Sequence, residues 1–226
     1  GVRPGSHDGI IEFGSNGSVL MGAETTEINI LDANSFEEIV SLEPQSEFRQ
    51  YAPSPYQPQV LAQDGNSLVF WNWRTGDVKR AAIEADASIL DIAFSPDGNA
   101  TIVVEQGVDE TKTSGRPQSG KLERWDVETA TRKVVSETFG GKIASLEYSL
   151  SGRFIKIHQG TRLRTLDAQT LNTVGVTPPG AVRSHRSSFL PTGDILTAAS
   201  GLPPRIYSVE LDLMEASPGR LSLGVV

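Results

Sequence analysis

The sequence predicts an all-β fold made of short strands, and three observations carry this prediction. Short apolar runs recur along the chain, as between Ile89 and Phe94. Turn pairs follow many of these runs, among them Asp97-Gly98 and Ser151-Gly152, where glycine reaches positive φ without steric cost. No window of a dozen residues has the apolar stripe of an amphipathic helix. We therefore expect antiparallel strands joined by tight turns.

The expected strands fall into five repeats of roughly 40 residues, a period typical of repeat architectures. One landmark closes an apolar strand before a turn, at Phe13, Pro53, Phe94, Tyr148 and Phe189. The second landmark is an Asp or its substitute, at Asp32, Asn72, Asp126, Asp167 and Ser208. The two landmarks are 19 residues apart in four repeats and 32 apart in the third. The shared spacing indicates real repeats, with 13 extra residues confined to the third repeat.

The third repeat carries the most specific motif. Phe94 opens the run Phe-Ser-Pro-Asp-Gly, and a later strand ends in Trp125-Asp126. With this motif the chain resembles the WD-repeat (WD40-like) β-propellers, and the resemblance extends over all five repeats. It implies four-stranded blades around a tunnel. It also implies a non-catalytic scaffold for protein–protein interaction.

The chain departs from the WD-repeat pattern in two respects. The Gly-His pair expected before the first strand is absent from every repeat, and Trp-Asp is intact only at Trp125-Asp126. We therefore expect the blades to rest mainly on apolar packing between sheets, with Phe13 and Phe94 among the packed residues. We also expect Trp71 to pack between blades and Trp73 to face the other way.

We expect a single propeller domain over residues 1–226. Its blades are expected at residues 7–43, 44–84, 85–138, 139–180 and 181–216. Residues 217–226 have the pattern of an innermost strand, which either clasps a closed ring of five blades or starts a sixth. In the second case the chain is part of a larger propeller of about seven blades, and its open sheet faces favour self-association.

Composition narrows the classes of partner. A formal charge of −8 over 226 residues argues against general nucleic-acid binding and against an acidic membrane surface. There is no cysteine, no apolar signal core and no run of membrane-spanning length, so we expect a cytoplasmic protein. The histidines His7, His158 and His185 occupy unrelated positions in different repeats. We therefore expect no metal site and no other cofactor.

The WD-repeat resemblance implies that recognition uses one end of the blades, which we call the loop face. Its expected loops are residues 23–27, 63–66, 107–120, 159–162 and 200–204. The candidate partner-binding residues on or near these loops are Arg49, Asp91, Lys112, Arg116, Arg162, Arg183, His185 and Arg186. Loops held by a rigid scaffold are the usual place for recognition, so we expect a protein or peptide partner here.

Charge is distributed unevenly along the chain. Residues 141–207 carry eight basic and three acidic side chains, which gives +5 for this segment and −13 for the remainder. Such contrast can mark a docking face. The plainer interpretation is that Arg162 and Arg164 point from a blade edge into water, where they discourage edge-to-edge pairing.

The extra residues of the third repeat lie at 107–120 and contain no large apolar side chain. Because they cannot bury themselves, we expect a mobile loop that acts as an adjustable lip of the loop face. The alternative is an insertion that is merely tolerated, since lengthening a loop costs little closure entropy.

The alternative function is a five-bladed carbohydrate-binding or glycoside-hydrolysing propeller. Such an enzyme needs carboxylates that point into the tunnel, one of them with a raised pKa. The candidate catalytic residues are Glu12, Asp91 and Glu147, and both glutamates directly precede the first landmark of their repeat. No tryptophan is near any of the three in sequence to stack on a sugar ring, so the non-enzymatic scaffold is favoured.

Overall fold

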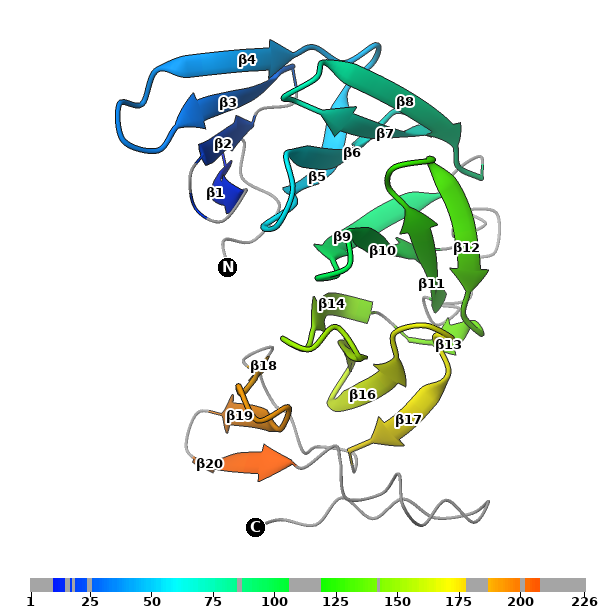
Figure 1. Ribbon diagram of the computed structural model, residues 1–226. Coiled ribbons are helices and arrows are strands. Elements are labelled where there is room, and N and C mark those ends of the chain that lie inside the picture. Colours follow the sequence, from blue (N-terminus) through cyan, green and yellow to red (C-terminus); the bar gives the residue numbers. More distant parts are fainter. Residues whose placement is uncertain are drawn as a thin grey trace.

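The computed structural model is an arc of five antiparallel β-sheets, each followed in space by the next sheet in the chain (Figure 1). It describes residues 10–14, 17, 19–23, 26–84, 87–105, 119–141, 143–177, 187–199 and 202–207. The described residues contain no α-helix. The prediction of an all-β fold of propeller type is therefore confirmed.

The sheets, called blades 1 to 5, are simple meanders in which neighbouring strands follow one another in sequence. Blade 1 contains β1 (Ile10–Gly14), β2 (Val19–Ala23), β3 (Ile28–Asp32) and β4 (Glu38–Leu42). Blade 2 contains β5 (Phe48–Pro53), β6 (Gln59–Asp64), β7 (Ser67–Asn72) and β8 (Asp77–Ala82). Blade 3 contains β9 (Ser88–Phe94), β10 (Asn99–Glu105), β11 (Ser119–Asp126) and β12 (Thr131–Val135).

Blade 4 contains β14 (Ile143–Tyr148), β15 (Phe154–Gln159), β16 (Arg162–Asp167) and β17 (Thr173–Val176). Blade 5 has three described strands, β18 (Ser187–Phe189), β19 (Ile195–Ala199) and β20 (Leu202–Tyr207). The short strand β13 (Phe139–Gly140) pairs with β11 and so joins blade 3 although it leads into blade 4. Within each blade the first strand lies on the inside of the arc (Figure 1).

The second sequence landmark is explained by the turn after the third strand. In the first four blades the side chain at that position accepts hydrogen bonds from backbone N–H groups two or three residues further on. Asp32 Oδ1, for example, accepts from Asn34 at 2.8 Å and Ser35 at 2.9 Å. Short polar side chains form this kind of turn readily, which is why Asp or Asn recurs there.

Four residues after this landmark the backbone enters the left-handed region in each of the same blades. The residues there are Phe36 (φ 59°), Gly76 (φ 80°), Ala130 (φ 54°) and Leu171 (φ 58°). Only Gly76 reaches this region without the steric cost of a Cβ atom. The capping side chain thus sets the turn geometry. It holds three non-glycine residues at a positive φ, although such residues prefer a negative φ.

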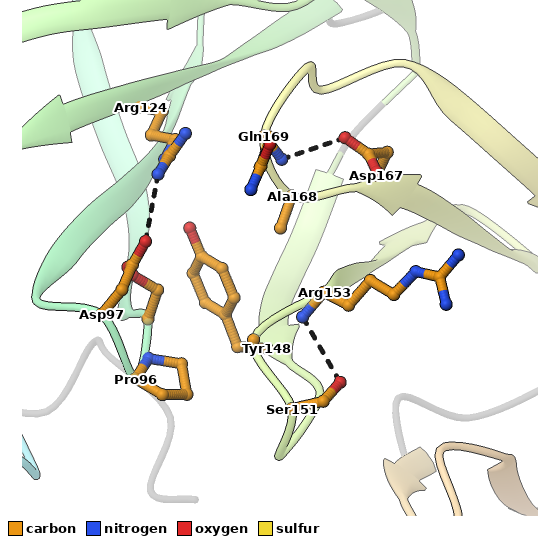
Figure 2. Close-up of a pocket in the computed structure, with 11 residues that line it drawn as sticks. Pro96, Asp97, Arg124, Tyr148, Ser151, Arg153, Asp167, Ala168 and Gln169 are labelled. Atoms are coloured by element: carbon orange, nitrogen blue, oxygen red, sulfur yellow. Dashed lines mark hydrogen bonds and ion pairs between the residues drawn. The ribbon is translucent and has the colours of Figure 1, made fainter.

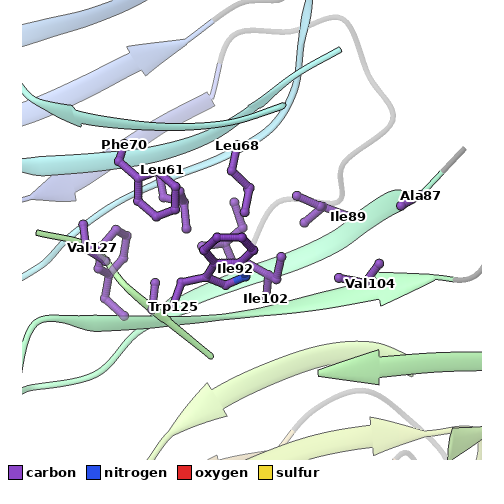
Figure 3. Packing of buried hydrophobic residues seen from close by; sticks show 12 residues of the cluster. Leu61, Leu68, Phe70, Ala87, Ile89, Ile92, Ile102, Val104, Trp125 and Val127 are labelled. Atoms are coloured by element: carbon purple, nitrogen blue, oxygen red, sulfur yellow. The ribbon is translucent and has the colours of Figure 1, made fainter. Parts of the chain in front are cut away.

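Apolar clusters between neighbouring blades form the core. The largest lies between blades 2 and 3, where Leu61, Leu68 and Phe70 meet Ile92, Ile102 and Trp125 (Figure 3). The rings of Phe70 and Trp125 have their centroids 5.8 Å apart. Equivalent clusters join blades 1 and 2, 3 and 4, and 4 and 5. A described blade with a neighbour on each side therefore buries apolar side chains on both faces of its sheet.

Two packing expectations were wrong. Trp71 and Trp73 lie in the same cluster between blades 1 and 2, because residues two apart on an extended chain point to the same side. Phe13 is exposed although its counterpart Phe94 is buried. Blade 1 has no described blade in front of it, so the face that carries Phe13 lacks the neighbour that covers Phe94.

Candidate interaction surface

The loop face is formed where the third strands begin and where the chain enters each new blade. Arg49 lies near the start of β5, and Arg162 is the first residue of β16. Both side chains are exposed, and neither makes an ion pair with any residue that the structure describes. The candidates Lys112, Arg116, Arg183, His185 and Arg186 lie outside the described residues, as do residues 107–118 of the insertion.

The interpretation of Arg162 and Arg164 as blade-edge residues was wrong. They belong to β16, which pairs with β15 on one side and β17 on the other. Arg164 is only partly exposed, since its guanidinium lies 4.9 Å from the centroid of the Phe139 ring and donates to Thr173 Oγ1 at 2.9 Å. Arg164 therefore serves the contact between blades 3 and 4, whereas Arg162 faces solvent.

Asp91, a candidate for both partner binding and catalysis, ties blade 3 to blade 4. Its Oδ2 accepts a hydrogen bond from the backbone N–H of Leu146 at 2.7 Å, and its Oδ1 accepts from the N–H of Ile92 at 2.9 Å. Burial raises the pKa of Asp91 to about 6, although both hydrogen bonds oppose this rise; the nearby charge of Glu12 adds to it.

Glu147 makes a corresponding tie between blades 4 and 5. Its Oε2 accepts a bond from Lys156 Nζ at 2.6 Å, and its Oε1 accepts from the backbone N–H of Phe189 at 3.1 Å. Lys156 is 2% exposed and also donates to the carbonyl oxygen of Ser187 at 2.8 Å. Burial lowers the pKa of Lys156, and the Glu147 carboxylate opposes that shift. Glu147 is thus engaged in a structural ion pair.

Gln63 and His158 occupy the same register position on the second strands of blades 2 and 4. Gln63 Oε1 accepts from the N–H of Ile89 at 3.2 Å, which fixes the entry of the chain into blade 3. His158 Nε2 is 2.7 Å from Ser187 Oγ in blade 5. His158 is therefore a hydrogen-bonded strand residue. Polar side chains at this position fasten one blade to the next.

A cavity opens at the end of the blades opposite the loop face, and Figure 2 shows the residues that line it. It has a volume of about 630 Å³ and lies between the turns of blades 3 and 4. Tyr148 stands at its centre, with Asp97 and Arg124 on one side and Gln169 on the other (Figure 2). A smaller cavity of about 180 Å³ lies between blades 2 and 3 at the same end.

The charges around the larger cavity are balanced. Arg124 Nη2 is 3.3 Å from Asp97 Oδ2, and Asp167 Oδ1 accepts from the backbone N–H of Gln169 at 3.1 Å. The hydroxyl of Tyr148 is bound to Thr101 Oγ1 at 2.6 Å. Arg153 is exposed at the rim, and its guanidinium lies 5.0 Å from the centroid of the Phe154 ring.

Sequence reasoning missed this cavity and the ion pair of Lys156. The cavity is built from three turns of two blades, and their sequences identify them as turns without showing that they border one space. The sequence did contain a signal for the ion pair of Lys156. A lysine at the centre of the apolar run Phe154–Gln159 is expected to be buried, and a buried charge needs a partner. Glu147 stands directly opposite Lys156 in the register of β14 and β15.

Within the part of the chain that the structure describes, no three His, Cys, Asp or Glu side chains are grouped to hold a metal ion. The described segments also include no helix of sufficient length and hydrophobicity to span a membrane.

The five sheets, stacked through apolar faces with their first strands inward, define a β-propeller of the WD type. No protein-family model and no curated protein matches the chain. Among solved structures, the chain is similar to the β-propeller domain of Cps50 (Swd1) from Myceliophteria thermophila, with a TM-score of 0.62 and 14% sequence identity. The match covers 89% of this chain and 70% of that domain. At this identity the likeness concerns the fold.

Proposed function

We propose that this chain is a non-catalytic propeller scaffold that binds a protein or peptide partner through its loop face. The observation that carries the proposal is the position of Arg49 and Arg162. Both are exposed at the same end of the blades, and both lack an ion-pair partner among the described residues. A rigid strand start fixes the backbone position from which each arginine reaches acidic groups of a partner, and this favours recognition.

Two of the three candidate carboxylates, Asp91 and Glu147, support the non-catalytic part of the proposal. Asp91 accepts two backbone N–H groups, and Glu147 is bound to Lys156 and to the N–H of Phe189. A glycosidase would need such groups to be directed at substrate, with one free to donate a proton. Here their hydrogen bonds hold neighbouring blades together. We further propose a cytoplasmic location, which fits a chain without cysteine.

The test is a quantitative affinity purification with three baits: the wild-type chain, the variant Arg49→Glu/Arg162→Glu, and the control Arg153→Glu. Arg153 is also an exposed arginine, but it lies at the opposite end, on the rim of the larger cavity. We expect a partner that the wild type and the control retain and that the loop-face variant loses. Loss with Arg153→Glu alone would place binding at the cavity and refute the proposal.

Deletion of residues 108–118, which lie outside the described residues, tests the insertion separately. We expect the melting temperature to stay nearly unchanged, because a loop of this composition buries little apolar surface. Affinity for the partner should fall if the loop is the lip of the site. Unchanged affinity would remove the insertion from the binding surface.

A further inference from the structure

The outer strand of blade 2, β8, forms a more regular edge than the other outer strands. In the ladders β3–β4, β11–β12 and β16–β17 the register shifts once, which marks a bulge in each. The ladder β7–β8 runs without a shift through six residue pairs, from Ser67–Ala82 to Asn72–Asp77. Bulges disturb an edge and so discourage the addition of another strand. Among the blades with four described strands, only blade 2 lacks this protection.

The hydrogen-bond pattern shows which backbone groups of β8 point outward. The N–H of Ile83 donates to the carbonyl oxygen of Asn66 at 3.1 Å, so this pair is a hydrogen-bonded one. Hydrogen-bonded pairs alternate along an antiparallel ladder, and the residues between them direct their N–H and C=O groups away from the partner strand. In β8 these residues are Val78, Arg80 and Ala82. β8 lies on the outside of the arc (Figure 1), and Val78 is 41% exposed.

The basic side chains of β8 are held by other parts of the protein. Lysine and arginine often protect a sheet edge by projecting beyond it into water. Here Lys79 Nζ donates to the carbonyl oxygen of Glu128 in blade 3. Arg80 Nη1 is 2.6 Å from Asp64 Oδ2 within blade 2. Both side chains are therefore drawn back onto the protein, and the edge stays accessible.

A small cavity adjoins this edge. Lys79 stands opposite Phe70 in the register of β7 and β8, and Phe70 packs against blade 3 in the same cluster as Val127 (Figure 3). Asp77 lies on the same side of β8 as Lys79, because it is two residues away. The cavity between blades 2 and 3 has a volume of about 180 Å³, and its lining includes Phe70, Asp77, Lys79, Val127 and Glu128. An outer strand added to blade 2 would therefore run beside a space for a side chain.

The lining of this cavity indicates which side chain fits. Asp77 and Glu128 are exposed, and neither forms an ion pair with any residue that the structure describes. The ammonium group of Lys79 is bound to a carbonyl oxygen, and Phe70 and Val127 contribute apolar surface. A long basic side chain matches this combination, because its methylene stem packs on apolar atoms while its charged end meets carboxylates.

We propose that β8 is a docking edge for an extended peptide segment of a protein partner, which becomes the fifth strand of blade 2. The segment pairs with the outward backbone groups of Val78, Arg80 and Ala82. Its side chains alternate between the two faces of the sheet, so a Lys or Arg beside Lys79 is directed toward the cavity. Backbone pairing then provides affinity, and the cavity provides specificity. The site is separate from the loop face and does not depend on the function proposed there.

The first experiment selects ligands for the edge. A phage library of short linear peptides is depleted on Val78→Pro, which lacks one outward N–H but keeps the ladder with β7, and is then selected on the wild-type chain. We expect peptides with a Lys or Arg that bind the wild type and the control Val78→Thr equally, and Val78→Pro at least about tenfold more weakly. If Val78→Pro melts well below the wild type, Ala82→Pro replaces it. A selection that yields no peptide of this kind would overturn the proposal.

The second experiment locates a selected peptide by amide hydrogen exchange, measured with nuclear magnetic resonance. We expect the peptide to slow the exchange of the outward N–H groups of Val78, Arg80 and Ala82. The N–H groups of Lys79 and Ala81 already bond to β7 and should change little. Protection confined to residues outside β8 would contradict docking at this edge.

The third experiment tests the place of the basic side chain. Asp77→Asn/Glu128→Gln should weaken binding of the selected peptide about tenfold, and so should replacing the Lys or Arg of the peptide by alanine. Both changes together should weaken it no more than either alone. The control Glu47→Gln, at an exposed glutamate before β5, should leave the affinity unchanged. Additive losses would place the basic side chain elsewhere and refute the assignment of the cavity.

Discussion

Replacing Glu147 by alanine is expected to destabilise the protein strongly, although this residue is partly exposed. The Glu147 side chain is 39% exposed, but its partner Lys156 is 2% exposed. In Glu147→Ala the ammonium group keeps only the carbonyl oxygen of Ser187, at 2.8 Å, and the nearby ring of Phe189. Breaking a buried ion pair by removing one partner costs about 3–5 kcal/mol. Water that enters the space left by the glutamate side chain reduces this cost, so we expect about 2–4 kcal/mol.

The origin of this loss can be separated with a double-mutant cycle. Lys156→Met removes the buried charge while Glu147 keeps water and the N–H of Phe189, so we expect a loss of only about 1 kcal/mol. Adding Glu147→Ala to Lys156→Met should then cost about 1 kcal/mol, much less than in the wild type. Urea unfolding followed by far-ultraviolet circular dichroism measures all four proteins. The control Glu47→Ala, at an exposed glutamate before β5, should change stability by less than about 0.5 kcal/mol.

The reasoning would be refuted if Glu147→Ala left the free energy of unfolding unchanged or raised it. A carboxylate that is kept for catalysis commonly costs stability, so its removal tends to stabilise the fold. The sign of this one change therefore separates a structural tie between blades 4 and 5 from a catalytic group. Equal losses in the wild-type and Lys156→Met backgrounds would show that the ion pair does not carry the effect.

Three further predictions concern the pKa, the turns and the core. Because the folded pKa of Asp91 is raised to about 6, its contribution to stability is lost as the pH rises from about 4 to 6. The free energy of unfolding of Asp91→Asn, relative to that of the wild type, should therefore rise by up to about 3 kcal/mol across that range. An equal difference in melting temperature between the two proteins at pH 4 and at pH 7 would refute this. Gly76→Ala should lower the free energy of unfolding by about 1 kcal/mol and Ala130→Gly should raise it by up to about 1 kcal/mol, because both positions have positive φ. Changes in the same direction for the two variants in urea unfolding would contradict that account. Phe70→Ala should cost about 3–5 kcal/mol in the same assay, since it leaves a cavity beside Trp125, and a loss below about 1 kcal/mol would show that the cluster can collapse.

The repeat and its strands were accessible from sequence because each landmark has a local cause. Asp32 and Asp126 cap turns formed by the next few residues, so they recur at a fixed distance whatever lies around them. Apolar alternation similarly identifies Ile92 and Phe94 as core residues. Signals of this kind depend on neighbours in the chain, and a single sequence contains them.

The remaining features depend on contacts between blades, which the chain order alone does not specify. The exposure of Phe13 follows from the lack of a described blade in front of it, and nothing at position 13 encodes that. The link from Asp91 to Leu146 joins residues 55 positions apart, and it uses a backbone N–H group that has no sequence signature. The cavity around Tyr148 likewise arises only when blades 3 and 4 are placed side by side.

A scaffold that presents loops from several blades as one surface requires those blades to behave as one unit. Differential scanning calorimetry of the purified chain measures this most directly, through the ratio of the calorimetric to the van't Hoff enthalpy of unfolding. Apolar faces and the ties made by Asp91 and Glu147 connect the blades, so we predict one transition with a ratio of about 1. Two or more separate transitions, or a ratio well above 1, would show that the blades unfold independently and would contradict a rigid platform.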